Sequence, residues 1–136
     1  MYSKYILSIE DNKTDIALMK RIFTKQIPDY ELKQICNGEE AMLFLEGEAF
    51  KLRMPKLILL DMKIPKIDGL EILETFRSHR EYEHIPVVIL SSSDLKKDIK
   101  DAYSLGANSF LEKPKSYAEL SEVLPVLIKY WIVYNK

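Results

Sequence analysis

The sequence predicts an α/β fold in which a parallel sheet is sandwiched between helices. Short apolar runs alternate five times with amphipathic segments, and polar residues, glycine or proline punctuate the steps between them. The runs at 57–60 and 87–90 are continuously apolar, as strands covered by helices on both faces require. Strict alternation of strand and helix implies right-handed crossovers between parallel strands, and therefore a doubly wound sheet.

The first half of the chain contains two strand–helix units. A strand is expected over 5–9, and the polar group at 10–12 separates it from an amphipathic helix that ends at Pro28. A second strand follows over 31–35. Asn37 and the glycine after it then open the second helix.

The third unit begins with the strand at 57–60, which ends at the charged residue Asp61. Pro65 and the Asp68-Gly69 pair punctuate the next loop, and the third helix follows them. The fourth strand occupies 87–90, directly after Pro86.

A fourth helix is expected from near Asp94 to Gly106, a residue suited to the left-handed conformation just past a helix end. The fifth strand covers 109–112. Ser116 and Glu119 have the spacing of a capping box, so the last helix starts there. Pro125 lies inside that helix, where we expect a kink or local break.

Composition bounds the class of protein. The chain has 136 residues, which we interpret as one domain over 1–136. Its 20 basic and 21 acidic residues give a net charge of −1, which argues against direct binding of nucleic acid. Cys36 is the only cysteine, so neither an internal disulfide nor a multi-thiolate metal site is available. With no leader after Met1 and no apolar run long enough for a bilayer, we expect a cytoplasmic protein that does not bind membranes.

Charged and polar side chains follow four of the predicted strands at the point where each strand ends. Glu10 and Asp11 follow the first strand, Asp61 the third and Ser91 the fourth, and Lys113 follows the fifth. Ligands of an open parallel sheet bind beyond the carboxyl ends of its strands. We therefore expect these five side chains to converge on one edge of the sheet.

The residue types at this edge favour a metal-assisted phosphoryl reaction. Three neighbouring carboxylates repel one another by about 4 kcal/mol per pair at about 4 Å and an effective dielectric near 20, so a cation must offset them. Oxygen donors without histidine or thiolate favour Mg²⁺, or the similar Mn²⁺. A carboxylate can accept a phosphoryl group, and Asp61 is the natural candidate. Lys113 and the Ser91 hydroxyl would contact the phosphoryl oxygens.

Five ordered motifs resemble those of the receiver domains of two-component response regulators, of the stand-alone, chemotaxis-regulator type. They are Ile9-Glu10-Asp11-Asn12, Leu60-Asp61-Met62-Lys63-Ile64-Pro65, Asp68-Gly69, Leu90-Ser91-Ser92 and Phe110-Leu111-Glu112-Lys113-Pro114. The match extends from about residue 5 to about residue 127. It implies a flavodoxin-like sheet with the strand order 2-1-3-4-5 and a cis bond between Lys113 and Pro114.

The resemblance also implies roles for single residues. Asp61 would be the phosphoacceptor, and the metal ligands would be Glu10, Asp11, Asp61 and the backbone carbonyl of Lys63. Ser91 and Lys113 would assist the reaction, and Ser91 and Phe110 would form the conformational switch. The phosphodonor would be a sensor histidine kinase or a phosphotransfer protein, and the signal would pass to a downstream protein target. Such a protein catalyses its own phosphorylation and dephosphorylation but is not otherwise an enzyme.

Three residues depart from the usual pattern of the family. Glu10 stands where aspartate is frequent, so its carboxylate reaches one methylene further. Ser91 replaces a threonine and lacks the β-branch that restricts rotamers. Lys63 occupies the position that faces the attacking water, and the sign of its effect on phosphoryl lifetime stays open.

Two other functions fit parts of the pattern. A phosphatase of the haloacid-dehalogenase type also uses a strand-end aspartate, Mg²⁺ and a lysine, but its second aspartate is replaced here by Lys63. A pseudo-receiver keeps the fold as a binding module and has lost phosphorylation. The complete set of acids, hydroxyl and lysine argues against it.

The aromatic end of the chain, at about 128–136, is atypical for a receiver. We interpret it as an extension of the last helix, and its residues include Tyr130, Trp131 and Tyr134. Two interpretations stay open, packing on the domain or a homodimer contact. Similar endings occur in single-domain receivers that partner bacteriophytochrome-type kinases.

Overall fold

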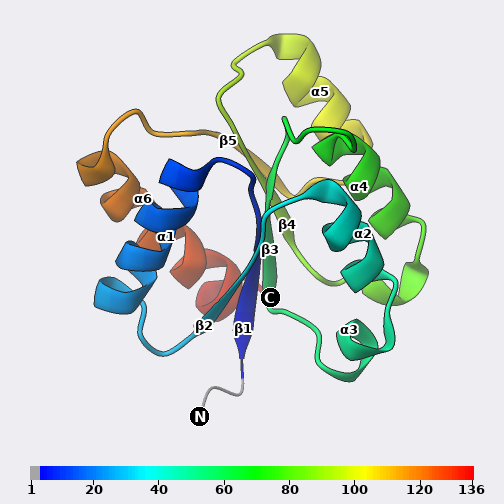
Figure 1. Cartoon of the computed structure of the whole chain (residues 1–136), viewed down its shortest axis with the longest axis horizontal. Helices are drawn as coiled ribbons and strands as arrows, with labels where there is room; N and C mark the ends of the chain where they lie inside the picture. Colours follow the sequence, from blue (N-terminus) through cyan, green and yellow to red (C-terminus); the bar gives the residue numbers. More distant parts are fainter. Residues whose placement is uncertain (1–3) are drawn as a thin grey trace.

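One parallel sheet forms the centre of the molecule. The computed structural model describes residues 4–136, so residues 1–3 of the predicted domain lie outside it. The strands are β1 (Tyr5–Ile9), β2 (Glu31–Ile35), β3 (Leu57–Asp61), β4 (Val87–Ser91) and β5 (Ser109–Glu112). Their order is β2-β1-β3-β4-β5, and each pairing is parallel (Figure 1). The flavodoxin-like order is thus confirmed.

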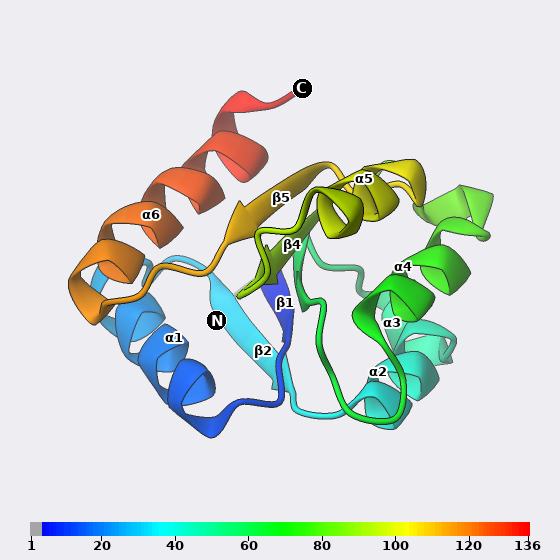
Figure 2. The same cartoon turned by 90° about the horizontal axis from the view of Figure 1, so that it is seen from above.

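Helices cover both faces of this sheet (Figures 1 and 2). One face carries α1 (Lys13–Gln26) and α6 (Tyr117–Lys129), which pack against each other. The other face carries α2 (Gly38–Leu45), α3 (Glu48–Leu52), α4 (Gly69–Arg77) and α5 (Lys96–Ser104). A single 3-10 turn, η1 (Arg80–Tyr82), follows α4, and a π-helical turn, η2 (Tyr130–Tyr134), extends α6.

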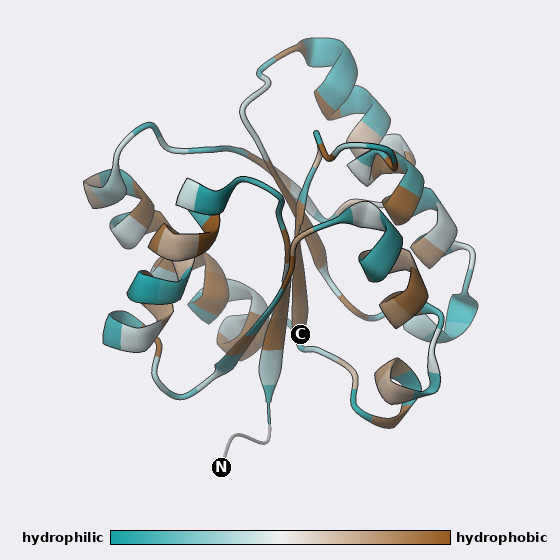
Figure 3. Cartoon of the chain, in the orientation of Figure 1, coloured by the Kyte–Doolittle hydropathy of each residue, from teal (hydrophilic) through white to brown (hydrophobic). Residues whose placement is uncertain are grey.

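The apolar core is divided by the sheet into two clusters. Side chains of β1, β3 and β4 alternate between them, so that Leu7 packs towards α2 and α4 while Ile6 packs towards α1 and α6. All residues of these three strands are buried. Figure 3 shows this apolar centre between helices whose outer surfaces are largely polar. The frame that carries the strand-end acids is therefore rigid.

Side chains cap the helices that start at the carboxyl edge of the sheet. Asn12 accepts a hydrogen bond from the Asp15 amide at the start of α1, and Asn37 accepts one from Glu40 at the start of α2. Ser116 Oγ accepts from the Glu119 amide, as the predicted capping box requires. These caps fix where each loop ends.

The structure differs from the expected elements in local ways. The short helix α3 and the turn η1 were not expected. Helix α6 runs without a break across Pro125, and the departure from α-helical geometry comes later, in η2, where the Asn135 amide bonds the Tyr130 carbonyl at 2.7 Å. The peptide bonds of the described residues are all trans, so the expected cis bond before Pro114 is absent, in line with the intrinsic preference of X–Pro bonds for trans.

The aromatic tail packs on the domain only in part. Trp131 and Ile132 contact the cluster beneath α1 and α6, whereas Tyr130 and Tyr134 are half-exposed or more. A homodimer contact through the exposed side chains stays a prediction. Over the described residues 4–136, none of the helices combines the length and the hydropathy that crossing a membrane would demand.

Candidate functional site

The strand-end side chains converge at one edge of the sheet. Glu10 directly follows β1, Asp61 is the last residue of β3, and both are almost fully buried, with 4% and 5% of their surface exposed. Ser91, the last residue of β4, has no exposed surface. Lys113 follows β5, and its amide donates to the Ser91 carbonyl at 2.7 Å. The residues expected at the carboxyl ends of these strands therefore lie along one edge of the sheet, as the sequence predicts.

Three carboxylates form a cluster with the dimensions of a metal site. Glu10, Asp11 and Asp61 each offer one oxygen, and these oxygens lie within 4.8 Å of one another. The donors are all hard carboxylate oxygens, two of the three side chains are buried, and Asp11 opens the cluster to solvent. This donor set fits Mg²⁺ or Mn²⁺.

Each oxygen of the Asp61 carboxylate has a neighbour that orients it. Oδ1 accepts a hydrogen bond of 3.2 Å from the backbone amide of Lys63, and Oδ2 lies 3.4 Å from Lys113 Nζ. The Lys63 side chain itself is exposed. Both carboxylate oxygens of Asp61 are thus engaged by neighbours, while the Lys63 side chain lies at the surface.

The Lys113 ammonium is shared among three acids. Nζ lies 2.7 Å from Glu10 Oε1, 2.9 Å from Asp15 Oδ2 and 3.4 Å from Asp61 Oδ2. Asp15, in the first turn of α1, was not predicted as a site residue. An acid in the first turn is also what favours a helix N-terminus in any protein, so only the tertiary structure reveals its contact.

Burial governs the titration of this network. Burial raises the pKa of Glu10 to about 7, because hydrogen bonds from Lys113 and the Asn12 amide offset the loss of water only in part and Asp61 adds repulsion. For Lys113, burial alone would lower the pKa, but the Glu10 and Asp15 carboxylates and the charge of Asp61 raise it overall. The lysine therefore stays charged near neutral pH.

The hydroxyl at the end of β4 is tied to the loop that follows. Ser91 Oγ accepts a hydrogen bond from the Ser93 amide at 3.0 Å, and Ser93 Oγ donates to Asp98 Oδ2 of α5 at 2.6 Å. On the neighbouring strand the Phe110 amide donates to Tyr103 Oη at 3.0 Å. Phe110 is partly buried against the core cluster beneath α4 and α5. Both predicted switch residues are therefore linked to α5.

The loop after Asp61 is tightly packed and locally strained. Lys66 has a φ of 70°, and the Ile67 amide donates to the Pro65 carbonyl at 2.8 Å, which closes a three-residue γ-turn of the rare type. A Cβ at Gly69 would clash with the carbonyl oxygen of Asp61. Only glycine allows α4 to start this close to the phosphoacceptor candidate.

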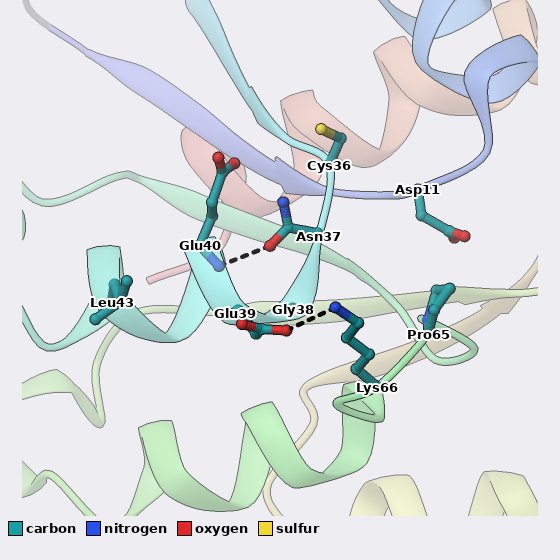
Figure 4. Close-up of a pocket in the computed structure, with 9 residues that line it drawn as sticks. All are labelled: Asp11, Cys36, Asn37, Gly38, Glu39, Glu40, Leu43, Pro65 and Lys66. Atoms are coloured by element: carbon teal, nitrogen blue, oxygen red, sulfur yellow. Dashed lines mark hydrogen bonds and ion pairs between the residues drawn. The ribbon is translucent and has the colours of Figure 1, made fainter.

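A cavity of about 420 Å³ opens beside the acidic cluster (Figure 4). Asp11 lies on one side of it and the start of α2 on the other. Lys66 reaches across to Glu39, with Nζ and Oε1 3.3 Å apart. The cavity thus borders the acidic cluster at Asp11 and the strained loop at Pro65 and Lys66.

Comparisons with known proteins agree with this geometry. The family model of the response regulator receiver domain matches residues 6–125. The response regulator Rcp1 of Synechocystis sp. is 34% identical over 131 residues, which cover 95% of this chain and 89% of Rcp1. The probable methanogenesis regulatory protein FilR2 of Methanothrix harundinacea is 32% identical over 132 residues, which cover 96% of this chain and 85% of FilR2. The resemblance seen in the motifs is confirmed.

Solved structures resemble the whole fold. The crystal structure of the phosphorylated cyanobacterial phytochrome response regulator RcpA gives a TM-score of 0.89 at 34% identity and covers 98% of this chain and 96% of RcpA. The crystal structure of the Mn²⁺-bound form of Rcp1 gives a TM-score of 0.86 at 32% identity, and the match covers 98% of this chain and 97% of the Rcp1 chain.

Proposed function

This chain belongs to the response regulator receiver domain family, and from that premise we propose that it accepts a phosphoryl group on Asp61 in a reaction that depends on Mg²⁺. One observation carries the proposal. The carboxylate of Asp61 is buried and belongs to a three-acid cluster, with the Lys113 ammonium 3.4 Å from its Oδ2. A nucleophile, a metal-binding acid pair and a fixed cation are thus brought together on buried strand ends.

The reaction is a substitution at phosphorus. An Asp61 carboxylate oxygen attacks, a P–O bond forms, and the bond between phosphorus and the donor atom breaks, a histidine nitrogen in a kinase or an oxygen in acetyl phosphate. The leaving group departs with the electron pair. Mg²⁺, held by Glu10, Asp11, Asp61 and the Lys63 carbonyl, would supply positive charge against the phosphoryl oxygens.

The remaining contacts come from Lys113 and Ser91. The ammonium already lies beside Asp61, so it needs only a small movement to bind a phosphoryl oxygen. The Ser91 hydroxyl would move towards the phosphoryl group, and its link to Ser93 and thus to Asp98 would change with it. We infer that this movement, with repacking of Phe110, shifts α5 and β5 between two packings.

The chain would therefore act as a signalling protein and not as an enzyme on an external substrate, apart from its own phosphorylation and dephosphorylation. We infer a histidine kinase or phosphotransfer protein as its donor, a downstream protein as its target, and a cytoplasmic location. Rcp1 and RcpA, both response regulators, support the assignment by similarity.

Intact-mass spectrometry after incubation with acetyl phosphate and Mg²⁺ tests the proposal. Wild type should gain the mass of one phosphoryl group, and a chelator should abolish the gain. Asp61→Asn should gain nothing, whereas Asp94→Asn, which changes an exposed aspartate in the loop after β4, should behave as wild type.

Two outcomes would count against the proposal. An unmodified wild type at every Mg²⁺ concentration would indicate a pseudo-receiver. Turnover of a chromogenic phosphate ester would indicate a phosphatase instead.

A further inference from the structure

The Lys113 ammonium has a binding partner that no step of the proposed reaction uses. Its contact with Asp15, at 2.9 Å, is shorter than its contact with Asp61, at 3.4 Å. An ammonium has three N–H donors, and in this structure three carboxylates surround it. A phosphoryl oxygen can therefore gain Lys113 only if one of these carboxylates gives it up.

Asp15 is held in place independently of Lys113. Its backbone amide donates to Asn12 Oδ1 at 3.0 Å, which caps the first turn of α1. Its side chain is about one-third exposed, with 31% of its surface accessible.

Asp15 also differs from the other two partners of Lys113. Glu10 and Asp61 belong to the three-acid cluster that fits a divalent cation, and Asp15 does not. A cation in the cluster offsets the charges of Glu10 and Asp61 but leaves Asp15 dependent on Lys113. Once the cluster is metal-bound, Asp15 is the carboxylate that still competes for the ammonium.

We propose that Asp15 is a positioning residue that competes with the phosphoryl group for the Lys113 ammonium and so weakens the phosphorylated state. This inference rests on the proposed function. A phosphoryl group adds negative charge beside Asp61, and the ammonium must then be divided between it and Asp15. Removing the charge of Asp15 frees Lys113 for the phosphoryl oxygens.

Titration with beryllofluoride, a non-hydrolysing mimic of an aspartyl phosphoryl group, measures this competition. At saturating Mg²⁺, amide NMR shifts give the apparent dissociation constant. Asp15→Asn should bind beryllofluoride about three- to tenfold more tightly than wild type, a range set by the partial exposure of the Asp15–Lys113 pair. Asp15→Glu, which keeps the carboxylate, should return the constant towards wild type.

Two further variants separate competition from a general change of charge. Glu112→Gln removes a carboxylate next to Lys113 in sequence that is not among the contacts of Nζ, and it should leave the constant within about twofold of wild type. In a Lys113→Met background, Asp15→Asn should have no effect, because there is no ammonium to release.

Each contrary result has a distinct meaning. If Asp15→Asn binds beryllofluoride no more tightly, or if its gain persists without Lys113, the competition is overturned while the phosphoacceptor assignment stands. If wild type binds no beryllofluoride at all, the proposed function fails and the inference fails with it.

Discussion

The carboxyl group of Glu10 has a pKa well above its ordinary value. Its carboxylate is buried beside two other acids, and burial raises its pKa to about 7. Metal binding requires the ionised form, so protons and Mg²⁺ compete for this side chain. The burial of Glu10 thus has a measurable consequence near neutral pH.

The affinity for Mg²⁺ should fall as the pH drops through the pKa of Glu10. We expect binding to be about tenfold weaker at about pH 6 than at about pH 8, because only a small fraction of Glu10 is ionised at the lower pH. Titration calorimetry in two buffers of different ionisation enthalpy measures both the affinity and the released proton. In Glu10→Gln the dependence in this range should disappear, and a slope equal to that of wild type would show that another group is responsible.

The raised pKa of Glu10 also determines how this residue changes the stability of the fold with pH. The pKa of Glu10 is higher in the folded chain than its ordinary value of 4.5. The folded state therefore holds the proton more tightly, and this contribution to the free energy of unfolding is complete below about pH 4.5 and is lost as the pH rises through about 7. Bound Mg²⁺ selects the ionised form and opposes the loss.

Among the elements, α4 is joined by a single side chain to the two loops that lead into β4 and β5. The Arg77 guanidinium donates four hydrogen bonds of 2.8 to 3.1 Å, to the carbonyls of Gly106, Tyr82 and Ile85 and to Asn108 Oδ1. Gly106 has a φ of 106°, and a Cβ there would lie 2.8 Å from Arg77 Cγ. The α5–β5 turn is thus shaped around this arginine.

Arg77→Met should lower the free energy of unfolding by about 2–3 kcal/mol, because the apolar stem remains but several carbonyls lose their charged donor. Urea unfolding measures the change. Arg80→Met, on the exposed side of η1, is the matched control and should change stability by less than about 0.5 kcal/mol. A loss no larger than that of the control would mean that water replaces the guanidinium at little cost.

The sequence predicts the strands better than the shortest helical elements. The observed bounds of β1, β2 and β5 agree with the expected ranges 5–9, 31–35 and 109–112, and the strands expected at 57–60 and 87–90 each end one residue later. Helix α3 has five residues and η1 has three, which is too short for a helical period to appear in the sequence. Their positions depend on packing, through Phe50 and Tyr82, whose rings stand 4.9 Å apart.

The part of the site that follows from the arrangement of the strands could be predicted from the sequence. Strand ends of a parallel sheet share one edge, so Glu10, Asp61 and Lys113 could be placed together from the sequence. Asp15 could not, because its contact with Lys113 joins α1 to the end of β5 and depends on how the helix packs. The link from Ser93 to Asp98 is also a tertiary contact without a local signal.

At the scale of the whole molecule, a near-neutral chain concentrates its negative charge at one edge. The net charge is −1, yet four carboxylates gather beside the ends of β1, β3 and β5, and three of them share Lys113. The buried strands hold these acids closer than they would lie in the unfolded chain. Part of the stability of the core therefore offsets a repulsion that serves the site.

The Asp11→Asn variant should separate the electrostatic cost of the acidic cluster from the role of the cluster in binding a cation. Asp11 belongs to the acidic cluster but is not a partner of Lys113, so its charge contributes repulsion without a compensating ion pair. In a chelator, the variant should unfold with a free energy about 1 kcal/mol higher than wild type, a value reduced by the partial exposure of Asp11. In excess Mg²⁺ the order should reverse, because wild type gains stability from the bound ion and the variant gains less.

Urea unfolding in both conditions measures the two differences, with the exposed Glu122→Gln on α6 as the control for lost charge. If Asp11→Asn were less stable than wild type without metal, the acids would not be repelling one another, and the case for a cation between them would lose its physical basis.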